Sequence, residues 1–407
     1  MILCVAIGET VPITESRKTR RQLVAMLSCV CFLIPSCVFA QTNVPLRRDP
    51  AATAMRRAGN LRHGINLSEW FAQVYDPKGY TKEHFDNWTT QQDIALVKAT
   101  GFDHVRLSVN PAPMFRQGHA NDISAEYLGY LDAAVKMILD QGLAVIIDIH
   151  PESDFKAKLV NDAFVEQFAD YWRALAHHYS NSDPDRVFFE ILNEPEISDR
   201  YRWYGIQAKL AAAIREGAPE HTIIAAGARY SSNDELLFLD PLADPNVIYN
   251  FHFYEPHVFT HQGATWGVNF WHFERNLPYP SSPESAGKVA SQIPDATNRM
   301  VILRYGMERW DAVRIGMEIG QVADWAKRWN VPVTCNEFGA FRKYSAPEDR
   351  AAWIHDVRTT LEQDGMGWTM WDYSGGFGVV TKADGKATPD EVTVHALGLK
   401  LPASARP

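Results

Sequence analysis

The most informative stretch of the sequence is Phe188-Phe189-Glu190-Ile191-Leu192-Asn193-Glu194-Pro195. A short apolar run that ends in Asn-Glu-Pro predicts a buried strand, and the proline stops further pairing. Glu194 is therefore expected at the carboxyl end of a strand. The run Val331–Gly339 has the same pattern, a mainly apolar run followed by Asn-Glu, and it places Glu337 in the position that matches Glu194. Either glutamate alone is more often a helix cap or a surface group, but together they predict paired acid chemistry.

Further apolar runs on both sides of these two predict six more strands. They are Leu61–Leu67, His104–Val109, Leu143–Ile149, Thr222–Ala226, Val247–Phe253 and Gly367–Trp371. Helices are expected between them. Thr89 and Gln92 resemble a capping box before a helix that ends at Gly101, and Ser124 begins a helix that ends at Gly142. The other helices are expected at about 161–179 and 202–216, along the face of Val322, Trp325 and Trp329, and after a cap formed by Ser345 with Glu348.

Eight near-continuous apolar strands that alternate with amphipathic helices predict a parallel sheet covered by helices. The expected fold class is α/β, a single (β/α)8 TIM barrel over residues 59–400 with enlarged βα loops. The alternative is an open doubly wound sheet, which is disfavoured because no glycine-rich turn follows the first strand. A long segment between Pro256 and Asp311 is rich in Pro, Trp, Phe and His. We expect it to be a loop excursion that could wall a cleft.

Residues 1–40 have the composition of a secretory signal peptide. Arg17, Lys18, Arg20 and Arg21 precede the apolar run Leu23–Ala40, which finishes Val38-Phe39-Ala40. The alternative is an uncleaved membrane anchor, but Pro35 and the Val-x-Ala ending favour cleavage. Residues 41–58 are expected to be a linker. The protein is therefore predicted to be secreted or periplasmic, with no membrane contact after cleavage.

Charge and cysteine content exclude several classes of protein. The chain has 49 acidic and 40 basic residues, and the leader alone holds four of the basic ones, so nucleic acid is a disfavoured partner. Four of the five cysteines also lie in the leader, which leaves only Cys335 and no internal disulfide. Cys335 lies in an apolar strand and is expected to be a buried, inert thiol.

In a barrel of this kind the active site is built at the carboxyl ends of the strands. The polar or aromatic residues predicted there are Asn66, Arg106, His150, Asn193, Glu194, His252, Tyr254, Glu337 and Trp371. This set contains no three-ligand metal pattern and no Gly-x-Ser-x-Gly elbow. We therefore expect no metal and no cofactor.

The strand endings resemble those of glycoside hydrolase family 5, a clan A family of retaining β-glycanases. The motifs that carry the resemblance are Val-Arg-Leu, Asp-Ile-His, Leu-Asn-Glu-Pro, His-Phe-Tyr, Cys-Asn-Glu-Phe-Gly and Met-Trp-Asp. They occur in order over about residues 60–380. Each motif alone has low specificity, but the complete ordered set is highly specific.

The resemblance implies a role for each of these residues. Glu194 would be the general acid/base and Glu337 the nucleophile, which agrees with the need of retaining hydrolysis for two carboxyl groups about 5 Å apart. Arg106 would lie beneath the nucleophile, and Tyr254 would hold it by a hydrogen bond. The remaining residues would contact the substrate: Asn193 at the sugar 2-hydroxyl, His150 and His252 in the central subsite, and Trp371 as a platform under the reacting sugar.

For some tryptophans and histidines the sequence leaves two interpretations open. Four tryptophans could stack on other sugar rings: Trp70, Trp203, Trp266 and Trp271. In a chain with twelve tryptophans, however, four at such positions are not evidence of sugar binding. His257 and His261 could bind zinc, but packing within a loop is the favoured interpretation, and neither is included in the predicted site.

The leading hypothesis is a secreted, monomeric endo-β-1,4-glucanase (cellulase) that hydrolyses polysaccharides by double displacement. A β-mannanase, a xyloglucanase or an exo-β-1,3-glucanase of the same family would share the strand-end residues and differ in the loops. The alternative from another class is a non-catalytic carbohydrate-binding protein on the same scaffold. The presence of both glutamates with Arg106 and Tyr254 argues against it, because binding alone needs no matched acid and nucleophile.

Overall fold

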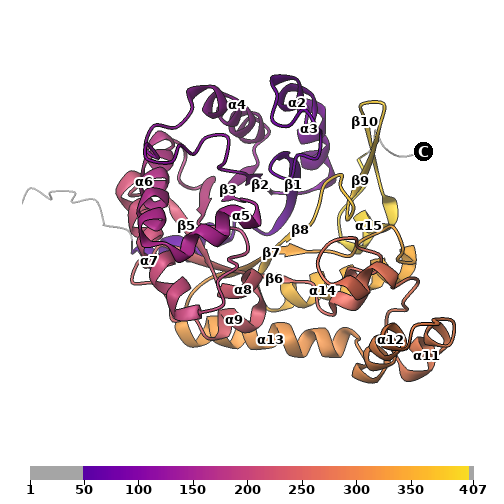
Figure 1. Ribbon diagram of the computed structural model, residues 1–407. Helices are drawn as coiled ribbons and strands as arrows, with labels where there is room; N and C mark the ends of the chain where they lie inside the picture. The colour runs from indigo at the N-terminus through magenta and orange to yellow at the C-terminus, as the bar shows by residue number, and fades with distance from the viewer. Residues whose placement is uncertain (1–48, 403–407) are drawn as a thin grey trace, which may run out of the picture. The chain divides into compact units, whose positions relative to one another are not determined.

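Eight parallel strands close into a barrel in chain order, β1 to β8 (Figure 1). The computed structural model describes residues 49–402. The predicted (β/α)8 fold is confirmed. The strands are β1 (His63–Phe71), β2 (His104–Val109), β3 (Ala144–Ile149), β4 (Val187–Glu190), β5 (Thr222–Ala226), β6 (Val247–Phe253), β7 (Val333–Phe338) and β8 (Gly367–Met370).

Helices surround the barrel, and their ends follow local capping chemistry. The longer ones that follow the strands are α3 (Gln91–Thr100), α4 (Ala125–Asp140), α6 (Asp162–His178), α7 (Arg200–Gly217), α13 (Ala312–Trp329) and α14 (Pro347–Gln363). Helix α3 is held by a capping box of Thr90 with Asp93, one residue later than predicted, and it ends at Gly101 with φ 110°. The predicted cap of α14 is wrong, because Ala346 occupies that position and the Ser345 hydroxyl donates to the Phe341 carbonyl.

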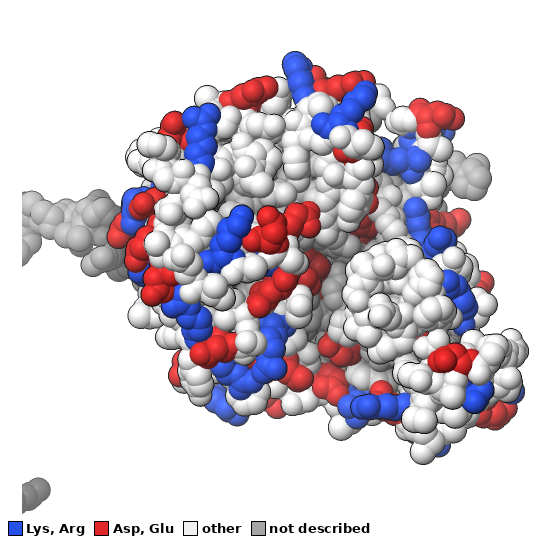
Figure 2. Space-filling model, viewed as in Figure 1, with Lys and Arg blue, Asp and Glu red and all other residues white. Residues whose placement is uncertain are grey.

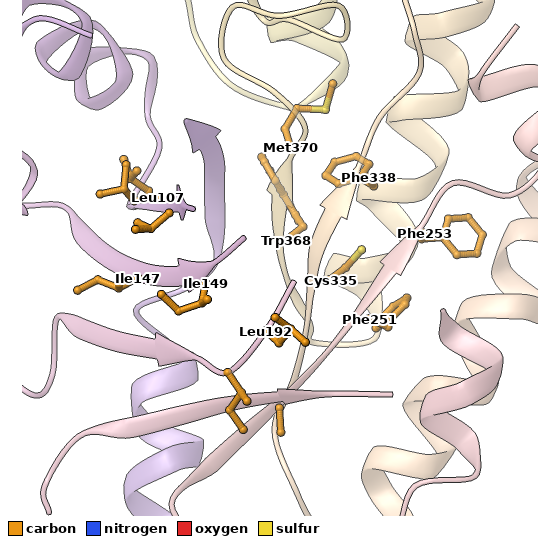
Figure 3. Packing of buried hydrophobic residues seen from close by; sticks show 14 of the residues in the cluster. Leu107, Ile147, Ile149, Leu192, Phe251, Phe253, Cys335, Phe338, Trp368 and Met370 are labelled. Atoms are coloured by element: carbon orange, nitrogen blue, oxygen red, sulfur yellow. The ribbon is translucent and has the colours of Figure 1, made fainter. Parts of the chain in front are cut away.

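The side chains of alternate strand residues divide between the barrel interior and the surrounding core. Strand register places Arg106 beside Ile146, which lies beside Phe188, so these three side chains share the interior face. The opposite face packs against the helices, and Figure 3 shows Phe251 and Cys335 in that core. The thiol of Cys335 is buried as predicted, and burial raises its pKa well above the usual value.

The floor of the barrel is closed by helix α1 (Pro50–Ala58), which lies within the segment predicted as a linker. Asp49 caps the helix, and Ala54 packs with Ile146 and Phe188 in the interior apolar cluster. Arg57 is buried and donates to Asp185 at 2.7 Å. Residues 50–58 thus form part of the folded barrel, which differs from the prediction. The predicted signal peptide and residues 41–48 lie outside the described residues.

Strand β4 is shorter than predicted and ends at Glu190, so Glu194 is not a strand residue. The chain beyond β4 still bonds to its neighbours, since the Ile191 amide donates to Ile224 and the Asn193 amide donates to Ile149. Glu194 itself has φ 46°, in the left-handed region, which breaks the extended conformation. Its side chain is consequently presented by a turn above the end of the strand.

The segment between Pro256 and Asp311 is largely helical, which corrects the prediction of a loop. It contains α10 (His257–Thr260), η2 (Asn269–Phe273), α11 (Pro283–Ala290) and α12 (Ala296–Glu308). Helices α11 and α12 form a hairpin at the edge of the molecule (Figure 1), where a Cβ on Gly306 would lie only 2.6 Å from Ala286. The first half of the segment lies beside the predicted site, and the hairpin does not.

Smaller elements complete the described chain. These are α2 (Lys82–Asn87), α5 (Ser153–Lys156), η1 (Ala157–Val160), α8 (Ala228–Ser231), α9 (Asn233–Leu237), β9 (Val380–Ala383), β10 (Lys386–Pro389) and α15 (Glu391–Ala396). On α13, Val322 and Trp325 are buried as predicted, but Trp329 is exposed. Within residues 49–402, no helix has the length and apolar character needed to cross a bilayer.

Candidate active site

Arg106 occupies the centre of the site, near the middle of β2, and it is fully buried. All five of its N–H groups are used. Two of them donate to Glu190 at 2.8 and 2.9 Å, and the others donate to Asn66, Asn193 and Glu337. The guanidinium is therefore fixed in one orientation. It connects β2 with residues on β1 and β7 and at the end of β4.

Glu337 is held on both of its oxygens. Arg106 Nη1 donates to Oε1 at 2.6 Å, and the Tyr254 hydroxyl donates to Oε2 at 2.9 Å. An arginine and a hydroxyl at these distances stabilise the negative charge of the carboxylate. Burial, followed by the charges of Glu337 and Glu194, raises the pKa of Tyr254 well above its usual value, so the hydroxyl stays protonated and can donate.

Glu194 lies opposite, and His252 joins the two carboxylates. His252 Nδ1 is 3.0 Å from Glu194 Oε1 and 3.5 Å from Glu337 Oε2. Burial lowers the pKa of His252 to about 4, and the ring is neutral at neutral pH. Glu194 is the more accessible of the two carboxylates, with 27% of its side chain exposed against 5% for Glu337. One carboxyl group can thus exchange protons with solvent while the other is enclosed.

The distance between the two carboxylates is short. One ligand atom from each of Glu194, His252 and Glu337 lies within 4.8 Å of the others. That separation fits two carboxyl groups that act on the same bond without a water molecule between them. The same three atoms could also hold a cation, so the expectation of a metal-free site stays a prediction.

Asn193 and His150 form the wall next to Arg106. Asn193 Nδ2 is 3.0 Å from His150 Nε2, and His150 Nδ1 is 2.9 Å from Asp148 Oδ2. Burial lowers the pKa of His150 to about 3, whereas burial raises that of Asp148 to about 7. The His150 ring lies parallel to Trp371, with centroids 5.7 Å apart and an interplanar angle of 15°. The structure therefore brings all nine residues predicted at the strand ends together, since Asn66 accepts from Arg106 and Trp371 packs against Tyr254.

Sequence reasoning missed the polar residues that lie beneath the predicted site residues. Asp148 and Glu190 both form ion pairs with Arg106, and Asn250 and Asn336 both donate to Glu190. Each lies on the interior face of a strand whose end carries a predicted residue. Asp148 is two positions before His150, and Asn250 is two before His252. The period of two along a strand places Asp148 and Asn250 on the interior face, but it does not show their pairing with Arg106 and Glu190.

A second carboxyl pair lies where β1 and β8 end. Asp372 is buried, and its Oδ2 accepts hydrogen bonds from the Ser68 hydroxyl at 2.6 Å and the Gly375 amide at 3.0 Å. Its other oxygen has no partner among residues 49–402. Burial and the charge of Asp372 raise the pKa of Glu69 to about 7. Asp372 follows Trp371 in sequence, and Glu69 lies near the end of β1, so the pair adds hydrogen-bond acceptors to the same end of the barrel.

The four tryptophans left open by the sequence separate into two kinds. Trp70 and Trp203 are core residues, and their indole N–H groups donate to the Phe85 and Ala226 carbonyls. A sugar-stacking role for these two is therefore wrong. Trp266 is 48% exposed, and Trp271 is partly buried. Both remain candidates for contact with substrate.

His257 and His261 pack with this second group. Trp271 stacks on His257 with centroids 5.6 Å apart and on His261 at 4.6 Å. His261 also packs edge-on against Tyr254, at 5.1 Å. The favoured interpretation of loop packing is confirmed, and the stack forms an aromatic wall beside Glu337. Figure 2 shows this face of the molecule hollowed near its middle, with acidic side chains along the hollow.

Residues 68–376 match the model of the family described as cellulase (glycosyl hydrolase family 5). The chain belongs to glycosyl hydrolase family 5. As a family 5 member with the complete strand-end set in place, it is a glycoside hydrolase, and the alternative of a non-catalytic carbohydrate-binding protein is set aside.

Curated relatives and solved structures agree with family 5. Endoglucanase C of Acetivibrio thermocellus is 29% identical over 321 residues, which cover 77% of this chain and 91% of that protein. Cellodextrinase A of Ruminococcus flavefaciens is 34% identical over 328 residues, or 77% and 85%. The crystal structure of endoglucanase Cel5A from the hyperthermophilic Thermotoga maritima is 26% identical, with a TM-score of 0.68, and covers 86% of this chain and 100% of that one.

Proposed function

We propose that this family 5 protein is a secreted endo-β-1,4-glucanase that works by double displacement with retention of configuration. The separation of at most 4.8 Å between the Glu194 and Glu337 carboxylate atoms carries the proposal. Inverting enzymes place their carboxyl groups about 6.5–9.5 Å apart to admit a water molecule, whereas retaining enzymes place them about 5 Å apart.

The two carboxylates take different roles because their surroundings differ. Glu337, paired with Arg106 and Tyr254, attacks the anomeric carbon and forms a glycosyl-enzyme. Glu194, accessible and next to neutral His252, protonates the leaving oxygen and then deprotonates the water that releases the sugar. The atoms balance over two steps, with one glycosidic bond broken and one water molecule consumed. No metal or organic cofactor takes part in this scheme.

The remaining residues bind the reacting sugar. Asn193 donates to the 2-hydroxyl, a contact that strengthens as positive charge develops at the anomeric carbon. Trp371 supplies a platform, and His150 and His252 line the central subsite. The aromatic wall of His257, His261 and Trp271 packs against Tyr254 and would line the cleft beside Glu337.

Relatives support β-1,4-glucan as the substrate class. Those that cover most of this chain are named endoglucanase or cellodextrinase, and a Thermotoga maritima Cel5A structure at 25% identity is a complex with cellobiose. A relative named xyloglucan-specific endo-β-1,4-glucanase, from Bacteroides ovatus, is 34% identical but covers only 36% of this chain. Linear β-1,4-glucan is therefore the substrate to test first.

The first test separates internal from terminal cleavage. On soluble carboxymethyl cellulose we expect viscosity to fall steeply before much reducing sugar appears, because cuts inside a chain shorten it most. Parallel viscometry and reducing-end assays measure this, with Glu337→Gln as an inactive control. Cellobiose or glucose as the sole product from the first minutes would contradict internal cleavage. Faster action on mannan or xyloglucan would change the substrate class and leave the mechanism standing.

Export is a separate part of the proposal. The leader is expected to be cleaved after Ala40, so the mature protein should begin near Gln41. Intact mass and amino-terminal sequencing of protein recovered outside the cytoplasm measure this directly. A mature protein in that compartment that still contains residues 1–40 would contradict cleavage.

A further inference from the structure

Asp148, Arg106, Asn193 and His150 form a closed ring of contacts beneath the central subsite. Arg106 Nη2 is 2.9 Å from Asn193 Oδ1 and 3.0 Å from Asp148 Oδ2. The ring closes through His150, which is 2.9 Å from Asp148 and 3.0 Å from Asn193. The side chains of all four are buried, so no bulk water competes for these contacts.

The direction of each hydrogen bond in the ring follows from Arg106. A guanidinium can only donate, so Asn193 must present its oxygen to Arg106 and its amide nitrogen to His150. His150 Nε2 must then accept, which leaves its single proton on Nδ1. The proton on Nδ1 needs an acceptor, and Asp148 Oδ2 is the atom placed to receive it. The position of every proton is thereby determined without reference to the substrate.

The ring controls what remains available on Asn193. One amide hydrogen faces His150, and the second has no partner among the described residues. If His150 carried its proton on Nε2 instead, two N–H groups would face each other across 3.0 Å. Turning the Asn193 amide over would not help, because its N–H₂ would then face Arg106. Without the acceptor at Asp148, a proton on Nδ1 has no partner and a proton on Nε2 meets the amide, so the orientation of the amide is no longer fixed.

We propose that Asp148 is a positioning residue that fixes the tautomer of His150 and, through it, the orientation of the Asn193 amide toward the sugar 2-hydroxyl. The proposal rests on the function assigned above, in which Asn193 contacts that hydroxyl. Asp148 would not touch substrate. The competing explanation is that Asp148 serves only as a counterion for Arg106, as Glu190 also does.

Two variants separate these explanations. Asp148→Ala removes both the charge and the acceptor. Asp148→Asn removes the charge but keeps an oxygen, which must face inward because Arg106 and His150 both approach the same atom, Oδ2. If Asp148 acts through the tautomer, the asparagine variant should behave like the wild type. A purely ionic role predicts that both variants behave alike.

The readout compares two substrates, dinitrophenyl β-cellobioside and its analogue without the 2-hydroxyl on the sugar that reacts. The wild type should prefer the first in kcat/KM by about 2- to 10-fold, the usual range for a hydrogen bond between neutral groups. Asn193→Ala should abolish most of that preference. Asp148→Ala should reduce it to nearly the same level, and the double variant should lose little more. Asn250→Ala removes a buried amide outside the ring and should leave the preference unchanged.

A second readout does not depend on activity. The ¹⁵N chemical shifts of His150 should show the proton on Nδ1 in the wild type and in Asp148→Asn, and on Nε2 in Asp148→Ala. A wild-type proton on Nε2 would overturn the proposal even if Asp148→Ala does not fold. The proposal would also be overturned if Asp148→Ala kept the substrate preference of the wild type while Asn193→Ala lost it. That outcome would leave the proposed function intact. A wild type without any preference would refute the role of Asn193 instead, and the tautomer would still decide the role of Asp148.

Discussion

Glu337→Ala is expected to lose activity on every substrate, by roughly 10⁴- to 10⁶-fold in kcat, because no other side chain can form the covalent intermediate. The loss should be the same whether the leaving group is a sugar or an activated phenol. Glu196→Ala is the matched control. Glu196 is a carboxylate two residues from Glu194 that pairs with Lys156 and Ser153, and its loss should alter kcat only slightly.

Glu194→Ala should give a different pattern. Natural glucans need a protonated leaving group, so their hydrolysis should fall by about 10²- to 10⁴-fold. Dinitrophenyl β-cellobioside needs no such help, so its first step should survive and the glycosyl-enzyme should accumulate. Azide can then enter the space of the missing carboxylate and restore turnover. The product should be a β-glycosyl azide, identified by NMR, because two inversions give retention.

The azide product also tests the assignment of roles. Rescue of Glu337→Ala, with an α-glycosyl azide as product, would mean that the acid/base and the nucleophile are reversed. An inverted product from the wild type, with no rescue of either variant, would exclude double displacement. In that case the carboxylate separation could not be that of the working enzyme.

Arg106→Met is expected to produce the largest loss of stability among single substitutions in the site. It leaves Asp148, Glu190 and Glu337 close together and buried without their cation. Breaking a buried ion pair from one side costs about 3–5 kcal/mol of unfolding free energy, and here three partners are affected. Urea titration followed by fluorescence measures the change. Arg304→Met is the control, because its pair with Glu308 on α12 is exposed and should contribute little.

The pH dependence of Arg106→Met gives a further check on the cause. Carboxyl groups in a desolvated cluster have folded-state pKa values above their unfolded ones, so they stabilise the fold below the unfolded pKa and lose that contribution as pH rises. The variant should therefore gain stability between pH 7 and pH 5. The triple variant Arg106→Met, Asp148→Asn, Glu190→Gln should recover most of the stability at pH 7 and remain inactive. Equal stability of Arg106→Met and the wild type at pH 7 would contradict the role of Arg106 as the shared cation.

Much of the fold could be predicted because the barrel strands are apolar and end abruptly. Strands β2, β5 and β6 have the predicted bounds. Strand β5 is a short, mostly apolar run, whereas polar and apolar residues alternate along β2 and over the second half of β6. The end of β4 could not be predicted, because Ile191 and Leu192 continue the apolar pattern although the backbone turns at Glu194. Helices α11 and α12 were missed because Pro, Ser and Asn at their starts are as typical of loops as of helix caps.

Only the site residues at the ends of the strands could be predicted from the sequence. Residues at strand ends stand out as polar side chains after apolar runs, which is why Glu194 and Glu337 were found. Asp148 lies within β3 and Glu190 is the last residue of β4, and both are buried, where a carboxylate is expected only if a cation neutralises it. Recognising them required pairing with Arg106, which depends on strand register that no single run reveals. The core positions of Trp70, on β1, and Trp203, on α7, were equally hidden, because the sequence does not show which face of each element packs inward at these residues.

The hairpin of α11 and α12 is closed by hydrogen bonds within its own segment, among them Tyr305 to the Pro278 carbonyl and the Ser281 amide to the Trp310 carbonyl. Its buried residues, such as Ala286 and Ile302, pack chiefly within the hairpin itself. A segment of this kind can open locally at a free energy well below that of global unfolding. Its amide hydrogens should exchange with solvent deuterium sooner than those of the strands, and a protease cut within it would leave the Arg106 network whole. Length changes during evolution would be tolerated there for the same reason, so this corner is where the chain could acquire new partners without altering its chemistry.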